Sequence, residues 1–387
     1  MERDIYDEDH AAFRDVVKEF IKRYATEEKR KQWDADGEID RATMLAAGEA
    51  GVIGLSVPEE FGGAGMLQDY RFRAIVNEEV IGAGLGSLAG ALGIQDDLAV
   101  PYIAHMGTQE QKETWLPRMA TGEILGALAM TEPGTGSDLR GIKTTAKKVD
   151  GGYIVNGAKT FISSGKTADI VVTFVKTGEG NRPDAFSLLI LEDGMEGFEH
   201  GKKLEKMGFH GWDTAELSFT DVFVPEANLI GGAEGRGFIQ LMMNLPLERL
   251  SIGVAAAAAG EAAFVWTREY TLSREAFGQP IADFQNTRFK LADMATTVDV
   301  MWAYIDRAMM LYKDAKLTAE EAAKVKFWAT DREWELLDVG VQLHGGYGYI
   351  TEYPIARAFL DARVHRIYGG TNEIMRDIVA RQITGRK

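Results

Sequence analysis

The sequence predicts an α+β protein, mostly α, in which a β domain interrupts a helical bundle. Three observations lead to this prediction. Apolar residues recur at helical spacing over residues 1–122, short strand-like runs follow over residues 123–232, and helical spacing returns over residues 233–387. Neither an internal repeat nor a low-complexity segment is detectable. We therefore expect three domains that meet near residues 122 and 232.

The first domain is expected to be entirely helical. Its first helix should follow Asp7 and bury one stripe, because apolar side chains recur there in steps of three and four residues, at Phe13, Val16, Phe20 and Tyr24. Further helical patterns surround Met44 and Ile75 and reach about Ala120, and the turn at residues 58–63 interrupts them.

The middle domain is expected to consist of strands. Residues 153–155 and 160–162 flank Asn156-Gly157, a dipeptide that supplies the positive φ angles of a tight hairpin turn. We therefore predict a hairpin at this point. Further strand-like runs cover residues 170–175, 186–191 and 216–219, the last ending at Val224-Pro225.

The third domain returns to helical spacing after Gly237. Residues 318–321, Thr-Ala-Glu-Glu, fit a capping box and should begin a helix. The apolar stretch at residues 252–259 is too short and too small-sided to span a bilayer, so no membrane span is expected. Its small side chains predict tight helix packing instead.

Composition narrows the class of protein. Apolar residues make up 45% and charged residues 26%, which is ordinary for a globular enzyme. The net charge of −16 disfavours nucleic acid as a partner, because binding to a phosphate backbone needs a surplus of Lys and Arg. Cysteine is absent and the six histidines have no metal-ligand spacing, so neither a thiol site nor a metal is expected. The amino terminus is typical of neither a signal nor a transit peptide, and we expect a cytoplasmic protein.

Glu248 is the most informative single residue. It lies three positions after Leu245 and four before Ile252, on the apolar face of the expected helix. Burial raises the pKa of a carboxyl group and makes it a better proton acceptor, so Glu248 is a candidate general base. The alternative is an ion pair with Arg249 or another cation. Pro246, which has no amide hydrogen, is expected to kink the helix beside it.

Three glycine-rich segments are candidate ligand sites. The loop at residues 130–138 would let backbone N–H groups and hydroxyls approach a flat or phosphorylated ligand, although a polar interdomain loop would have the same composition. It is not a dinucleotide fingerprint, because Leu139 stands where the third glycine belongs. The turns at residues 342–348 and 368–373 imply either close backbone approach or simple helix caps.

Taken together, several motifs resemble the acyl-CoA dehydrogenase family over nearly the whole chain. They are Thr131-Glu132-Pro133-Gly134, the turn at residues 58–63, Lys206-Met207-Gly208, the segment 274–278 and the two final glycine turns. Residues 244–250 and 367–371 look most like the long-chain type. The resemblance implies an N-terminal helical domain, a middle β-barrel-like domain, a C-terminal four-helix bundle, a homotetramer, and FAD as cofactor.

The resemblance also implies the site residues. One subunit would contact FAD through Leu128, Met130, Thr131, Gly136, Ser137, Phe161, Ile162 and Ser163. A neighbour would contribute Arg274, Phe277, Gln285, Gln342, Gly345 and Gly346, while the adenosine side would be held by Thr371 and Glu373. The acyl-CoA would be contacted by Ser137, Arg249, Tyr368 and Gly370.

Many relatives carry the catalytic base between the Tyr and the Gly-Thr of the last turn, where this chain has Gly369. Long-chain and isovaleryl-type members instead have Glu at the position of Glu248, so the resemblance implies that Glu248 removes the α-proton. The Gly369 N–H would stabilise the enolate, and an electron-transferring flavoprotein would reoxidise the flavin in fatty acid β-oxidation. The length of the acyl group that the pocket accepts would depend on packing around residues 94–100. Trp212 would either narrow the site or fill a surface groove.

Three alternatives remain at this point. The first is an isovaleryl-type enzyme for branched or short acyl chains. The second is an oxidase of the same fold that uses O2. The third, a flavin-bearing relative that binds nucleic acid, is disfavoured by the acidic balance and by the presence of Glu248.

Overall fold

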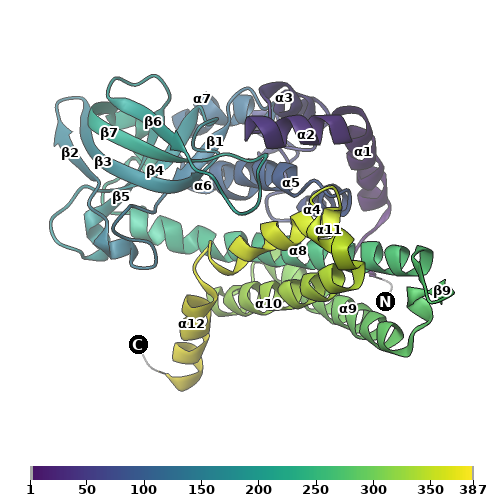
Figure 1. Ribbon diagram of the computed structural model, residues 1–387. Helices are drawn as coiled ribbons and strands as arrows, with labels where there is room; N and C mark the ends of the chain where they lie inside the picture. The colour runs from purple at the N-terminus through teal and green to yellow at the C-terminus, as the bar shows by residue number, and fades with distance from the viewer. Residues whose placement is uncertain (1–2, 386–387) are drawn as a thin grey trace.

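The computed structural model describes residues 3–385, and these residues form a helical layer, a curled sheet and a second helical layer (Figure 1). The sheet lies at one end of the molecule, with the first helices beside it. The long helix α8 passes beneath both and joins the C-terminal helices. The predicted fold class is therefore confirmed.

The first layer contains seven α-helices: α1 Glu8–Tyr24, α2 Glu27–Asp36, α3 Arg41–Glu49, α4 Arg71–Gly82, α5 Gly86–Gly93, α6 Val100–Met106 and α7 Gln109–Ala120. A π-helix, Ile94–Ala99, joins α5 to α6. Asp7 caps α1 as expected, and of the predicted stripe Phe20 is buried and Phe13 packs partly buried against the core, but Val16 and Tyr24 do not belong to it. Val17 is fully buried, whereas Val16 and Tyr24 are 42% and 39% exposed. The helix turns its His10, Val17 and Phe20 face inward, toward α4.

Seven strands form the sheet: β1 Gly126–Ala129, β2 Thr145–Val149, β3 Gly152–Ser163, β4 Ile170–Lys176, β5 Phe186–Glu192, β6 Phe198–Lys203 and β7 Thr214–Pro225. Their order is β1-β4-β2-β3-β7-β6, and β5 pairs with β4. β1, β2 and β6 were not predicted from the sequence.

The predicted hairpin at Asn156-Gly157 is wrong, because both residues lie inside the continuous strand β3. The pairing of β3 with β7 shifts between Val155 and Gly157, which marks a bulge. A Cβ atom at Gly157 would lie 2.5 Å from Thr144, so the strand needs glycine for this close approach. The Asn156 side chain is bound to Asp221 on β7, with both contacts at 2.9 Å.

The second helical layer contains α8 Gly237–Ser273, α9 Gln285–Lys313, α10 Ala319–His344, α11 Pro354–Ala362 and α12 Asn372–Thr384. Two short strands, β8 Glu275–Ala276 and β9 Gln279–Pro280, form a hairpin between α8 and α9. The capping box at Thr318 is confirmed, since its side chain and that of Glu321 cap each other. α8 is assigned as one helix through Pro246, so that residue does not end it.

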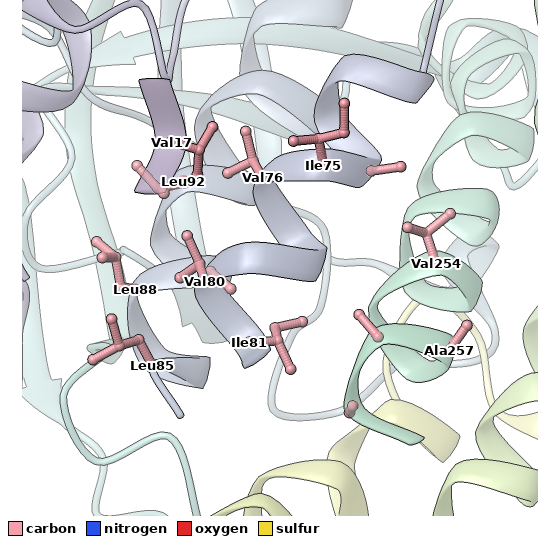
Figure 2. Close-up of a cluster of buried hydrophobic side chains, with 14 of the residues drawn as sticks. Val17, Ile75, Val76, Val80, Ile81, Leu85, Leu88, Leu92, Val254 and Ala257 are labelled. Carbon is pink, nitrogen blue, oxygen red and sulfur yellow. The ribbon is translucent and has the colours of Figure 1, made fainter. Parts of the chain in front are cut away.

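α8 is the central helix of the core. In the part of the chain that the structure describes it is the one helix long and apolar enough to cross a membrane by length and composition, but 72% of that stretch is buried inside the protein. Figure 2 shows Val254 and Ala257 of α8 facing Ile81 and neighbouring side chains of α4. A Cβ atom at Gly253 would lie 2.5 Å from Val325, so the predicted tight helix packing is confirmed.

Candidate active site

Glu248 belongs to α8, and its side chain lies inside the protein against α6. Its side chain is 2% exposed, and its Oε1 accepts a hydrogen bond of 2.7 Å from the hydroxyl of Tyr102. Burial raises the pKa of the Glu248 carboxyl to about 7, although the Tyr102 hydrogen bond and the charge of Arg249 act in the opposite direction. A carboxyl group with this pKa is suited to accept a proton at neutral pH.

Arg249 does not pair with Glu248, contrary to one of the two sequence interpretations. Among residues 3–385 neither side chain forms an ion pair, and the guanidinium of Arg249 donates no hydrogen bond there. Arg249 is 6% exposed, its Nε is buried without a partner, and burial lowers its pKa. A buried cation without a partner beside a candidate base is suited to contact an anionic or polar ligand.

The second candidate position, Gly369, lies against the same part of α8. Gly369 and Gly370 have φ angles of 64° and 90°, which side chains other than glycine rarely adopt. A Cβ atom at Gly369 would lie 2.4 Å from Cδ1 of Ile252, which is one helical turn beyond Glu248. The structure thus brings the turn at residues 368–371 to the same face of α8 as Glu248.

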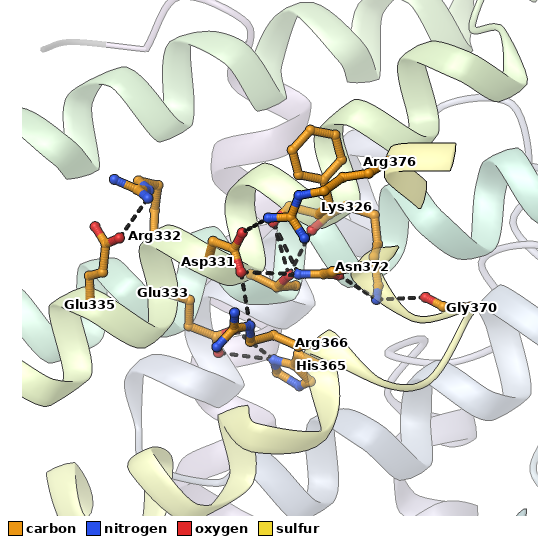
Figure 3. Close-up of polar contacts among 12 residues, drawn as sticks. Lys326, Asp331, Arg332, Glu333, Glu335, His365, Arg366, Gly370, Asn372 and Arg376 are labelled. Atoms are coloured by element: carbon orange, nitrogen blue, oxygen red, sulfur yellow. Dashed lines mark hydrogen bonds and ion pairs between the residues drawn. The ribbon is translucent and has the colours of Figure 1, made fainter. Parts of the chain in front are cut away.

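A polar network fixes this turn from the far side (Figure 3). Lys326 is fully buried, and its Nζ donates to the carbonyl of Gly370 and to Oδ1 of Asn372, both at 2.9 Å. Burial, and next the charge of Arg249, lower the pKa of Lys326 to about 7. The ring of Tyr368 stacks on His365, whose Nδ1 contacts the buried Glu333 at 2.9 Å.

The first group of expected flavin contacts comes together beside the sheet. The amide of Thr160 donates to the carbonyl of Thr131 at 3.0 Å, so the segments 130–137 and 161–163 are neighbours. A buried ion pair of 2.9 Å between Lys159 and Glu132 holds the base of the loop. Leu128 and Ile162 point into hydrophobic clusters, so only their backbone atoms remain for a ligand.

Several residues of this region are exposed. Phe161 has a φ of 59°, an unusual backbone conformation for a bulky residue, yet its side chain is 68% exposed. Gly136 and Ser137 are exposed in the adjoining loop, and a Cβ atom at Gly134 would meet nothing within 4 Å. The exposed Phe161 ring and the open loop beside it leave room for a ligand at this place.

The second group of expected flavin contacts lies elsewhere. Arg274 ends α8, Gln285 begins α9, and Gln342, Gly345 and Gly346 surround the end of α10. The guanidinium of Arg274 lies 6.0 Å from the ring centre of Tyr347, which joins these segments. Figure 1 shows the hairpin that contains β9 at the opposite end of the molecule from the sheet. One chain therefore does not bring the two groups together.

Thr371 and Glu373, the expected adenosine contacts, begin α12. The Thr371 side chain accepts a hydrogen bond from the amide of Ile374 at 3.3 Å and caps the helix. Glu373 is exposed in the first turn. They directly follow the glycine turn in the chain, and Figure 1 shows α12 far from the hairpin that contains β9.

Trp212 is inside the protein, so the surface-groove interpretation is wrong. It is 6% exposed, and its Nε1 donates to Oγ of Ser164 at 2.9 Å. A Cβ atom at Gly90 would lie 2.4 Å from the indole ring, so Trp212 packs directly on α5. It also lines a small cavity of about 10 Å³ between the first helices and the sheet.

Tyr102 is the residue of this site that the sequence did not reveal. It stands in an apolar run, and nothing in the spacing showed that its hydroxyl would meet a carboxylate 146 positions away. The one available signal was general, since a buried tyrosine usually needs a hydrogen-bond partner.

Comparisons with known proteins agree with this arrangement. Models of the N-terminal, middle and C-terminal domains of acyl-CoA dehydrogenase match residues 7–123, 127–222 and 235–384. The chain is 41% identical to the mitochondrial long-chain specific acyl-CoA dehydrogenase of Rattus norvegicus over 383 residues, which are 98% of this chain and 88% of that protein.

Solved structures give the same result. The crystal structure of acyl-CoA dehydrogenase from Geobacillus kaustophilus superposes with a TM-score of 0.94 at 41% identity, covering 99% of this chain and 100% of that one. Acyl-CoA dehydrogenase complexed with FAD from Bacillus anthracis superposes with a TM-score of 0.90 at 31% identity, covering 98% of this chain and 68% of that one.

Proposed function

This chain belongs to the acyl-CoA dehydrogenase family, and we propose that it oxidises medium- to long-chain acyl-CoA thioesters with Glu248 as the catalytic base. Proteins of this family are FAD-dependent oxidoreductases that act on CH–CH groups. One observation carries the proposal for the base. Glu248 is a buried carboxyl with a pKa of about 7, and it stands one helical turn before Ile252, the residue against which Gly369 packs.

In the proposed reaction Glu248 removes the α-proton of the thioester. Bound FAD supplies the acceptor for the β-hydrogen, which leaves as hydride, so that the product is a trans-2-enoyl-CoA. The Gly369 N–H would stabilise the negative charge on the thioester oxygen, because the Lys326 contact to Gly370 holds the turn rigid. Arg249 and Tyr368 are the neighbouring groups that would contact the substrate. An electron-transferring flavoprotein is the proposed electron acceptor.

Substrate preference and acceptor are tested together by anaerobic titration. Purified protein should be yellow, and acyl-CoA should bleach the flavin absorbance. In a series from butyryl-CoA to stearoyl-CoA, with isovaleryl-CoA included, we expect the fastest bleaching with medium and long chains. Reoxidation should be fast with electron-transferring flavoprotein and slow with O2. Absence of bleaching with every thioester would contradict the proposal, and fast reoxidation by O2 would make the protein an oxidase.

We also propose that FAD sites form between copies of the chain, in a homotetramer. This is supported by the separation of the two groups of flavin contacts and by the exposure of apolar side chains near the β9 hairpin. Phe277 is 97% exposed with a φ of 54°, while Tyr349 and Phe289 are 90% and 61% exposed. Large apolar side chains exposed together usually mark an interface.

Phe277→Asp should weaken both assembly and FAD retention, because it places a charge where an apolar contact is expected. We expect a smaller species in size-exclusion chromatography and less FAD per chain after gel filtration. Phe223→Asp is the matched control, since Phe223 is 47% exposed on β7 and belongs to neither group of flavin contacts. An unchanged oligomer with full FAD content in Phe277→Asp would contradict the proposal.

A further inference from the structure

We propose that Tyr102 is a positioning residue for Glu248: its hydroxyl holds one carboxylate oxygen, so that the other oxygen is directed to the substrate. This inference rests on the proposed role of Glu248 as the base. It adds a residue from the first helical layer to a site otherwise built from α8 and the final glycine turn.

The contact divides the two oxygens of the carboxylate. Oε1 accepts the hydrogen bond of 2.7 Å from Tyr102. Oε2 has no hydrogen-bond partner in the described part of the chain. It is also not one of the unpartnered polar atoms that are fully shielded from solvent, so it remains accessible. A single donor therefore restricts the rotation of the carboxylate while one oxygen stays accessible, which is the geometry that a proton acceptor needs.

Tyr102 is itself held in place by the elements before it. It is fully buried in α6, directly after the π-helix Ile94–Ala99. Gln95 anchors the π-helix, because its Nε2 donates to two backbone carbonyls and its Oε1 accepts from the amide of Gly126, all at 2.9 Å. Asp97 forms a buried ion pair of 3.0 Å with Arg73. A π-turn changes the helical register, and such turns are frequent at functional sites.

A second polar contact fixes α6 against α8 one turn before Glu248. Nδ1 of His105 lies 3.2 Å from Oδ1 of Asn244, and Asn244 is 2% exposed. His105 and Asn244 stand three positions after Tyr102 and four before Glu248, so the two pairs lie on one seam between the helices. This arrangement fixes the direction of the Tyr102 hydroxyl as well as its distance.

The charges around the two side chains show in which direction Tyr102 changes the pKa of Glu248. The groups that act on Glu248 are Tyr102 from α6 and Arg249 on its own helix, and both lower the pKa that burial raises. Burial and the negative charge of Glu248 raise the pKa of Tyr102 well above its usual value, so the phenol remains a donor throughout the working range of pH. Removal of the hydroxyl should therefore raise the pKa of Glu248 further.

Tyr102→Phe removes only the hydroxyl and is the direct test. We expect the pH profile of anaerobic flavin reduction to move upward by about one unit, because the carboxylate loses its one hydrogen bond. From a starting pKa of about 7, that shift lowers the rate at neutral pH about fivefold and leaves it near the parental value at high pH. The Kd for acyl-CoA should be unchanged. Tyr153→Phe is the matched control, since Tyr153 is fully buried on β3 and its hydroxyl also donates to a carboxylate, that of Glu234, at 2.9 Å.

A second variant guards against a general folding defect, and a second measurement follows the carboxyl group of Glu248 without turnover. Site-specific 3-fluorotyrosine at position 102 is a stronger donor, so it should move the pH profile in the opposite direction. Infrared titration of the carboxyl band that Glu248→Gln removes should show the same upward shift in Tyr102→Phe without any substrate. Opposite shifts in the two variants would support the inference.

The failures of the two proposals have different signatures. If Glu248→Gln reduces flavin at the parental rate, the proposed base is wrong. If Glu248→Gln is inactive but Tyr102→Phe has an unmoved pH profile and an unmoved infrared titration, Tyr102 does not act on the base and the inference is overturned. A rate lowered by the same factor at every pH would also overturn it.

Discussion

Glu248→Gln is expected to stop flavin reduction almost completely while FAD content and acyl-CoA binding remain. Glutamine keeps the shape of the side chain and can still accept the hydrogen bond from Tyr102. It cannot accept the α-proton, and loss of a general base commonly costs roughly 10²–10⁴-fold in rate. Stopped-flow reduction under anaerobic conditions measures the rate, and the long-wavelength spectral change on adding substrate measures binding.

Glu261→Gln is the matched control for this variant. Glu261 lies on the same helix, is partly buried, and accepts a hydrogen bond of 2.8 Å from Nε1 of Trp302. Burial raises its pKa as well, so it shares with Glu248 a raised pKa and a single hydrogen-bond donor, but it is less buried and stands elsewhere on α8. Its replacement should leave flavin reduction intact. Equal effects of the two substitutions would mean that loss of a buried carboxylate on α8, and not loss of the base, causes the defect.

Thermal unfolding separates the catalytic role of Glu248 from a structural one. Its pKa is raised from 4.5 to about 7 in the folded protein, so the unfolded state loses its proton more readily and the ionised group destabilises the fold above about pH 4.5. The neutral glutamine removes that cost, and we expect the Tm of Glu248→Gln at neutral pH to equal or exceed the parental value. A lowered Tm with unchanged reduction would indicate a structural group instead.

The order of the domains could be predicted because each has its own spacing of apolar residues. The position of a turn within the sheet could not be predicted from a turn-forming dipeptide alone. Asn156-Gly157 has the composition of a hairpin turn, yet it forms a bulge inside β3, where Thr144 passes close to Gly157. The connection between β2 and β3 is made at Asp150-Gly151, where Gly151 has a φ of 75°. Both dipeptides supply positive φ angles, and pairing between distant strands decides which of them turns the chain.

The candidate site also has a part that the sequence predicts and a part that only the packing reveals. The burial of Glu248 followed from its spacing on one helix, which is local information. Its partner could not be predicted, because the contact with Tyr102 depends on how α6 crosses α8 and on the register that the π-helix imposes. The clash that Ile252 would make with a side chain at Gly369 also arises only from packing.

A further set of substitutions transfers the base from α8 to position 369 in the final glycine turn. In Glu248→Gln, adding Gly369→Glu alone should restore little activity, because Cδ1 of Ile252 lies 2.4 Å from the position of the new Cβ. A φ of 64° in a residue other than glycine costs a further ~1–2 kcal/mol. Ile252→Val removes the one interfering atom, so the triple variant Glu248→Gln, Ile252→Val, Gly369→Glu should accept the new carboxylate.

We expect this triple variant to reduce flavin about tenfold faster than Glu248→Gln, because a general base contributes roughly 10²–10⁴-fold and a displacement of about 1 Å loses roughly 10²-fold of it, which leaves a gain of up to roughly 10²-fold. The control carries Gly369→Gln in place of Gly369→Glu, which fills the same space without a proton acceptor and should show no gain. Full FAD content and an intact oligomer establish that each variant is folded. Equal rates in the glutamate and glutamine versions would show that a carboxylate at the turn does not reach the α-carbon, and that in this chain Glu248 has no substitute there.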